Sequence, residues 1–205
     1  MESPALWDYY QPGRVEGVDL ILSCGDLKRE YLEFLVTMTG KPVFYIPGNH
    51  DKRYLTQPPE GCECIDDQVL TYRGVRFAGL GGCKRYSDDP YQYTEKEMAV
   101  RVKRLQRRIK KAGGVDVFVT HAGMTGYGDA EDFAHRGFDC FREVLDNWHP
   151  QFFCHGHVHQ SYGWNIPRTV DYEGIPVVNA YERYVIEVKE PELPEKGRKR
   201  KGWLR

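Results

Sequence analysis

A histidine-rich turn places the strongest constraint on what this chain can fold into. His155-Gly156-His157-Val158-His159 directly follows the apolar run Phe152-Phe153-Cys154, a pattern typical of a buried strand that ends in a tight turn. Neutral imidazole is the commonest protein ligand for transition metals, and this turn brings two or three imidazoles together. Gly156 lets the backbone bend where a side chain would collide with an ion or its ligands. The turn therefore predicts a metal site at the end of a strand.

Three further apolar runs end in residues that bind metals. These runs lead into Gly25-Asp26, into Gly48-Asn49-His50-Asp51 and into His121. Ligands that follow consecutive parallel strands gather at the carboxyl edge of an α/β sheet, so we expect these groups to meet. Carboxylate, amide and imidazole together suit Mn, Fe or Zn ions, and the lack of a thiolate in the set argues against a structural zinc. We predict two ions, roughly 3.5–4 Å apart, that hold a water and clamp a phosphate.

The two residues after Asn49 suit acid catalysis. His50 is adjacent to Asn49 at a loop apex, so it can face the substrate while Asn49 faces the metal. His50 can then protonate a leaving oxygen or stabilise the charge of a phosphoryl group. We expect Asp51 to hold His50 in one tautomer and to raise its pKa. Any one of these histidines alone could equally be a polar loop residue, but their joint occurrence at strand ends favours the metal site.

Apolar spacing predicts alternating strands and helices, which indicates a parallel sheet with crossover helices. We expect helices at 2–10, 30–38, 93–112 and 138–148, and strands at 18–23, 43–46, 68–72, 75–80, 115–120, 151–154, 175–179 and 183–188. The helix at 93–112 has an apolar stripe. We expect a solvated face, or else a contact with phosphate, for its basic residues Arg101, Arg104, Arg107, Arg108 and Lys111. The glycine-rich loop at 122–137 is long enough to suggest a function.

Length and charge favour one soluble domain. The chain has 205 residues and a net charge of -1, so it has no bulk attraction to nucleic acid or to an anionic membrane. It contains neither an apolar run of membrane-spanning length nor a signal-like leader, and we expect a cytoplasmic protein whose six cysteines are reduced. Residues 1–189 are expected to form the domain. Residues 190–205 are expected to form a disordered basic tail that either aids solubility or contacts an acidic partner.

The motifs, taken in order, resemble those of the calcineurin-like metallophosphoesterase superfamily. They are Gly25-Asp26, Gly48-Asn49-His50-Asp51, His121 and Gly156-His157-Val158-His159, and the resemblance covers residues 18–188. It implies an α/β (α+β) fold, the four-layer αββα sandwich, with a dinuclear metal site. It also implies that Asp26 bridges the two ions, that Asn49, His121 and His157 complete one site, and that His159 belongs to the other. His50 is then the acid or charge-stabilising histidine, with Asp51 behind it.

The sequence departs from the family at its start. The opening Asp-x-His motif and the strand that carries it are absent from this sequence, either because the start is internal or because this member lacks them. In the first case Glu2 is a candidate for the position of the motif's histidine. We therefore expect a sandwich that lacks its first strand. The ion served by Asn49, His121 and His157 should stay bound, while the second should titrate out easily.

Two functions are consistent with these residues. The first is a phosphoric ester hydrolase that attacks a phosphomonoester or phosphodiester with metal-bound hydroxide, with a nucleic acid possible only as substrate. The alternative is a non-catalytic scaffold of the same fold that binds a protein partner. The presence of His50 and Asp51 favours the enzyme, whereas the absence of the opening motif favours the scaffold.

The loop that follows His121 adds two candidate substrate ligands. It contains His135 and Arg136, and it resembles loops that lie beside the metals in bacterial and archaeal members. Arg136 suits bidentate contact with a phosphate, or else it pairs with Asp132 or Asp139 near the next helix. Tyr86 lies near another glycine turn, where it either stacks on an aromatic leaving group or packs on the surface.

Overall fold

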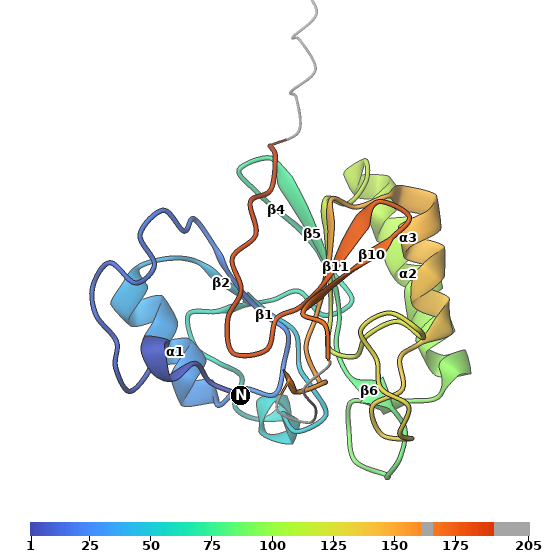
Figure 1. Ribbon diagram of the computed structural model, residues 1–205, viewed down its shortest axis with the longest axis horizontal. Helices are drawn as coiled ribbons and strands as arrows, with labels where there is room; N and C mark the ends of the chain where they lie inside the picture. Colours follow the sequence, from blue (N-terminus) through green and yellow to red (C-terminus); the bar gives the residue numbers. More distant parts are fainter. Residues whose placement is uncertain (161–165, 191–205) are drawn as a thin grey trace, which may run out of the picture.

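Two β-sheets pack face to face and carry helices on their outer faces (Figure 1). The computed structural model describes residues 1–160 and 166–190. The small sheet contains, in order, β1 (Ile21–Ser23), β2 (Val43–Tyr45) and β3 (Glu63–Cys64). The large sheet contains, in order, β10 (Thr169–Tyr172), β11 (Ile175–Asn179), β9 (Phe152–His155), β8 (Val117–Thr120), β5 (Val75–Leu80) and β4 (Val69–Tyr72).

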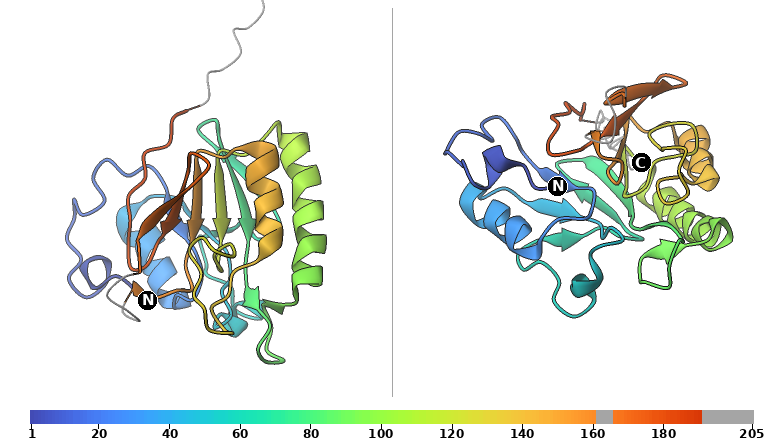
Figure 2. Two further views of the ribbon diagram at one scale, coloured as in Figure 1. Left: turned by 45° about the vertical axis from the view of Figure 1, so that its right-hand side comes forward. Right: turned by 60° about the horizontal axis from the view of Figure 1, so that its bottom comes forward.

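Helices complete four layers. Helix α1 (Arg29–Thr39) covers the small sheet, while α2 (Glu95–Ala112) and α3 (Arg142–Trp148) lie side by side on the large one (Figures 1 and 2). The shorter elements are the 3-10 helices η1 (Pro4–Leu6), η2 (Lys52–Leu55) and η3 (Asp139–Phe141), and the paired strands β6 (Cys83–Lys84) and β7 (Gln92–Tyr93). This arrangement is the predicted αββα sandwich.

Alternating side chains divide the apolar core into layers. On β8, Val117 and Val119 face the core between the two sheets, while Phe118 faces the core beneath α2 and α3. On β2, Phe44 likewise joins the core between the sheets, while Tyr45 packs with α1. Because the central strands are buried on both faces, they read in the sequence as continuous apolar runs.

Helix α2 is capped at both ends, but one residue of its basic face is buried. Thr94 and Glu97 form a reciprocal capping box, and Gly113 ends the helix with a left-handed φ of 80°. Arg101, however, is only 7% exposed and makes an ion pair of 2.6 Å with Asp66. The prediction that Arg101 lies on a solvated face was therefore wrong, because an ion pair compensates the cost of its burial.

Two predicted elements do not form. In place of a helix at 2–10, the structure has only η1 followed by turns, and Trp7 packs its ring 5.1 Å from Tyr31 and 5.2 Å from Phe34. In place of a strand at 183–188, the chain runs without ladder pairing, although Ile186 and Val188 pack against the core between the sheets. In both segments the apolar spacing reflects docking onto the domain.

Strand β1 lies at the edge of the small sheet. Within the described residues its only strand partner is β2, to which it pairs in parallel. No described helix is both long and apolar enough to cross a membrane. All six cysteine thiols are free. The predicted tail falls almost wholly at 191–205, outside the described residues, and the domain boundary stays a prediction.

Candidate metal centre

Four strand ends meet on the seam between the two sheets. Asp26 and Asn49 follow β1 and β2 of the small sheet, whereas His121 and His157 follow β8 and β9 of the large sheet. The interpretation that put all four strands in one sheet was wrong. A strand buried on both faces has the same apolar sequence pattern in either sheet, so the pattern does not show to which sheet the strand belongs. Each sheet thus supplies two of these four predicted ligands.

His121 is the buried hub of this centre. Its side chain is fully buried, and its Nδ1 donates to the carbonyl oxygen of Cys24 at 2.7 Å. Its Nε2 lies 2.9 Å from Asn49 Oδ1 and 3.2 Å from Asp26 Oδ2. Two oxygens thus converge on one ring nitrogen. Either a proton on Nε2 or a cation in the place of that proton would offset the negative charge of these oxygens. The ligand atoms of Asp26, His121 and His157 all lie within 4.8 Å of one another, so the donor set fits a divalent ion.

Electrostatics favour the ligand forms of Asp26 and His157, whereas His121 holds its proton more tightly. Burial alone would raise the pKa of Asp26, but His121 and the backbone N–H of His50 outweigh it and hold that pKa well below its usual range. Burial likewise works to lower the pKa of His121, but the Asp26 carboxylate prevails and the net pKa is raised. Burial, helped by the nearby charge of His121, lowers the pKa of His157 to about 3. At neutral pH, Asp26 is therefore ionised and His157 is neutral, as metal ligation requires.

The backbone is strained where the ligands sit. Asp26 has a φ of 57° and His157 a φ of 65°, in the left-handed region that most residues avoid. Such strain persists where the surrounding structure imposes it, and it is concentrated at functional sites. Gly48 is needed for a different reason, since a Cβ at this position would lie 2.6 Å from His121 Cε1 and would collide with the Asp26 carboxylate.

Asp51 has a different role from the one we predicted. Its Oδ2 accepts hydrogen bonds from the backbone N–H of Gly48 at 2.7 Å and of Asp26 at 2.8 Å. Within the described chain, no hydrogen bond joins Asp51 to the ring of His50, so the expected support of that ring was wrong. Asp51 instead ties together the two loops that carry the ligands. Burial raises the pKa of Asp51 to about 6, although the hydrogen bond from Gly48 works in the opposite direction.

The loop after β8 packs His135 against His157. His157 Nε2 donates to the carbonyl oxygen of Ala134 at 2.9 Å, which leaves the lone pair of the ring on Nδ1. The rings of His135 and His157 lie 4.8 Å apart, as do those of His121 and His157. The Nδ1 of His135 lies within hydrogen-bond distance of Asp132 Oδ1, at 2.9 Å. The structure thus places His135 beside a predicted metal ligand.

The other two predicted residues lie further out. His159 lines the same cavity and packs its ring 5.1 Å from that of Tyr181, but it stands outside the group of three converging ligands. Arg136 is exposed and donates through Nε to the carbonyl oxygen of Glu131 at 3.4 Å. It does not line the cavity, so its position gives no support to a direct phosphate contact.

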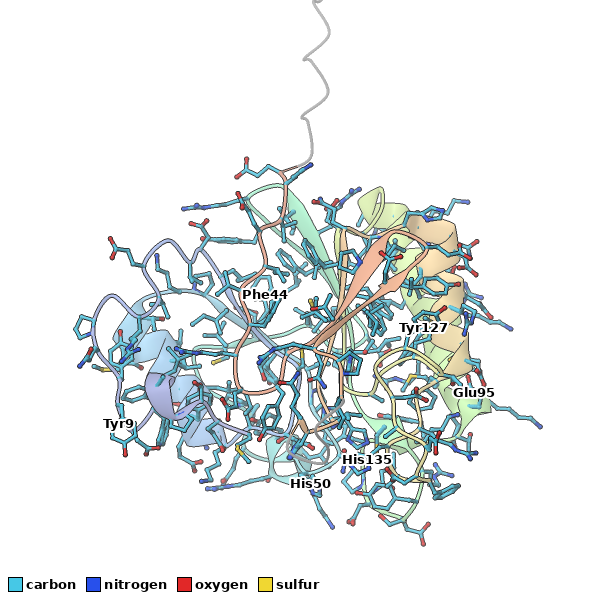
Figure 3. All side chains as sticks on the ribbon, viewed as in Figure 1. Tyr9, Phe44, His50, Glu95, Tyr127 and His135 are labelled. Atoms are coloured by element: carbon cyan, nitrogen blue, oxygen red, sulfur yellow. The ribbon has the colours of Figure 1, made fainter. Side chains whose placement is uncertain are left out.

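A cavity of about 760 Å³ opens over the centre. Its walls include four of the five predicted metal ligands, all except His121: Asp26, Asn49, His157 and His159. The predicted acid His50 and the candidate substrate ligand His135 also line it. Figure 3 shows the labelled His50 and His135 close together at the lower end of the molecule. Glu2 also lines the cavity, where its Oε1 accepts a hydrogen bond from the Lys28 N–H at 3.0 Å.

One contact was missed by the sequence reasoning. Asn49 Nδ2 donates to the hydroxyl oxygen of Tyr86 at 2.8 Å, and Tyr86 lines the cavity. The sequence predicts for Tyr86 only a role of its ring, in stacking or in surface packing. No local pattern predicts its hydroxyl contact, because the contact depends on how the loop at 85–91 folds over the centre.

Comparison with known proteins bears on the family and the fold. The model of the calcineurin-like phosphoesterase family matches residues 2–161. A solved crystal structure shares the fold with a TM-score of 0.55 at 18% sequence identity, and the match covers 75% of this chain and 64% of that one. The chain therefore spans less than two thirds of the length of that structure. The comparison with curated proteins gives no match.

Proposed function

Since this chain belongs to the calcineurin-like phosphoesterase family, we propose that it is a metal-dependent hydrolase of phosphate monoesters or diesters. The observation that supports this most is the convergence of Asp26, His121 and His157 beneath a cavity of about 760 Å³. A cavity of this size admits a phosphate ester together with part of its leaving group.

The ligand arrangement favours one strong and one weak ion site. Asn49, His121 and His157, with Asp26 shared, would hold one Mn, Fe or Zn ion. His159, Asp26 and Glu2 would hold the other more weakly. Divalent ions bound there neutralise phosphate charge and lower the pKa of water. Elemental analysis should find about one firmly held metal per chain, and two equally firm ions would contradict this assignment.

The remaining chemistry falls to the chain's own side chains. The backbone N–H of His50 donates to Asp26 Oδ1 at 2.8 Å, which fixes His50 at the mouth of the centre with its exposed ring in the cavity. This position supports the proposal that His50 gives a proton to the leaving oxygen. His135, held by Asp132, lines the other side of the cavity and is proposed to donate to a phosphoryl oxygen.

Hydrolysis of aryl phosphate monoesters and diesters with added Mn²⁺ tests this function. Asp26→Ala should abolish turnover, and His50→Ala should lower kcat by about 10²–10⁴-fold while metal binding is retained. His149→Asn is the matched control, because His149 is exposed at the end of α3 and does not line the cavity. Equal rates in all four proteins would refute the catalytic assignment. Tight Mn²⁺ binding without turnover of any ester would instead support the scaffold alternative.

A further inference from the structure

The amide of Asn49 is held from both ends. Its Oδ1 lies 2.9 Å from His121 Nε2, and its Nδ2 donates to the Tyr86 hydroxyl oxygen at 2.8 Å. Asp26 Oδ2 is also 3.2 Å from the same His121 nitrogen, so a proton or a cation lies at that nitrogen, and either one requires an acceptor oxygen from Asn49. The amide oxygen therefore faces the ligand cluster, and the amide NH₂ faces Tyr86.

This orientation decides whether Asn49 can bind a cation. Only the amide oxygen is a metal ligand, whereas the NH₂ group would direct its partial positive charge at the ion. The terminal torsion of asparagine is broad and roughly two-fold, so the flipped orientation is sterically accessible. Asn49 is only 5% exposed, so without Tyr86 its NH₂ group would lose its hydrogen-bond acceptor in a place with little access to water.

Tyr86 is itself fixed by its loop. The backbone N–H groups of Tyr86 and Ser87 donate to Gln92 Oε1 at 2.9 and 2.8 Å, and Gln92 is 4% exposed. An ion pair of 3.2 Å between Asp89 and Lys52 ties the same loop to η2. Tyr86 therefore stands on a braced segment, although its ring is 40% exposed in the cavity wall.

We propose that Tyr86 is a positioning residue whose hydroxyl keeps the oxygen of Asn49 turned toward the metal. The proposal rests on the metal-dependent function proposed above, since it concerns a ligand of the same centre. Groups that orient metal ligands in this way typically account for 10–100-fold in metal affinity or activity.

Mn²⁺ titration of purified variants, followed by calorimetry, tests the role of Tyr86. Tyr86→Phe keeps the ring and removes the acceptor, so its Kd for Mn²⁺ should rise by about 10–100-fold, with a fall in kcat at subsaturating metal. Saturating Mn²⁺ should largely restore kcat, because the hydroxyl acts through Asn49. Tyr91→Phe is the control, since Tyr91 ends the same loop but does not line the cavity, and it should bind Mn²⁺ as the wild type does.

A double-mutant cycle shows whether the effect passes through the amide. In an Asn49→Ala background, Tyr86→Phe should change the Kd for Mn²⁺ less than twofold, because no amide remains to be oriented. Unchanged Mn²⁺ affinity in Tyr86→Phe overturns the proposal, and so does an equal loss in both backgrounds. A wild-type protein that binds Mn²⁺ but hydrolyses no ester would refute the proposed function and leave this inference standing.

Discussion

Removal of the Asp51 carboxylate should destabilise the protein through two backbone groups. The carboxylate accepts from the N–H of Gly48, which is buried, and from that of Asp26, which is partly buried. A buried N–H without a partner costs about 1–3 kcal/mol, and a partly buried one lies near the bottom of that range. Asp51→Ala should therefore lower the free energy of unfolding by about 2–4 kcal/mol. In a chain of this size this corresponds to a fall in Tm of roughly 4–16 °C.

Asp51→Asn is the matched variant. Both N–H groups reach the same oxygen of Asp51, so one amide oxygen can accept both hydrogen bonds. Urea denaturation of the metal-free proteins at pH 5, where the buried Asp51 is largely protonated, should place Asp51→Asn within about 1 kcal/mol of wild type. If Asp51→Ala is within about 0.5 kcal/mol of wild type, or if the two variants are equally destabilised, this reasoning is refuted.

The same pair of proteins has a pH signature. Burial raises the pKa of Asp51 from 3.8 to about 6, so the folded state holds this proton more tightly than the unfolded state does. The contribution of Asp51 to stability is therefore present at low pH and lost as the pH rises through 6, by about 3 kcal/mol in total. Wild type should lose stability relative to Asp51→Asn between pH 4 and pH 7, and parallel profiles would contradict the assignment.

Two further predictions concern the metal. Because Asp26 raises the pKa of His121, a proton competes with the ion for this imidazole. The Mn²⁺ affinity measured by calorimetry should therefore fall up to tenfold per pH unit below that pKa. An affinity that does not change from pH 5 to pH 8 would refute this prediction. Gly48→Ala should abolish tight Mn²⁺ binding, because its Cβ would displace the Asp26 carboxylate. Retention of wild-type affinity would show that the loops move apart freely.

The layered fold was largely predictable because its strands and helices have strong local patterns. The helix expected at 93–112 is observed as Glu95–Ala112, and the strand expected at 175–179 is observed with the same bounds. The resemblance supplied the sandwich, because local pattern does not show which strands pair. Trp7 illustrates the limit, since its apolar spacing comes from packing on Tyr31 and Phe34 and not from a helix.

The site was predictable in its membership but not in its internal contacts. The sequence predicted that four side chains at strand ends would meet at one edge of the fold: Asp26, Asn49, His121 and His157. These side chains do converge. The partners of Asp51, in contrast, are backbone N–H groups that only the packing of two loops brings close. Every residue except proline has such a group, so no residue type in the sequence indicates these hydrogen bonds.

The position of the centre on the seam between the sheets gives a bound ion a mechanical role. Asp26 and Asn49 come from one sheet and His121 and His157 from the other, so a bound ion would cross-link the two sheets. A ligand at one hundred times its Kd stabilises a folded protein by about 2.7 kcal/mol. Because each sheet supplies two of the four donors of the firmly held ion, separation of the two sheets would remove half of its ligands, and release of the metal would accompany that separation.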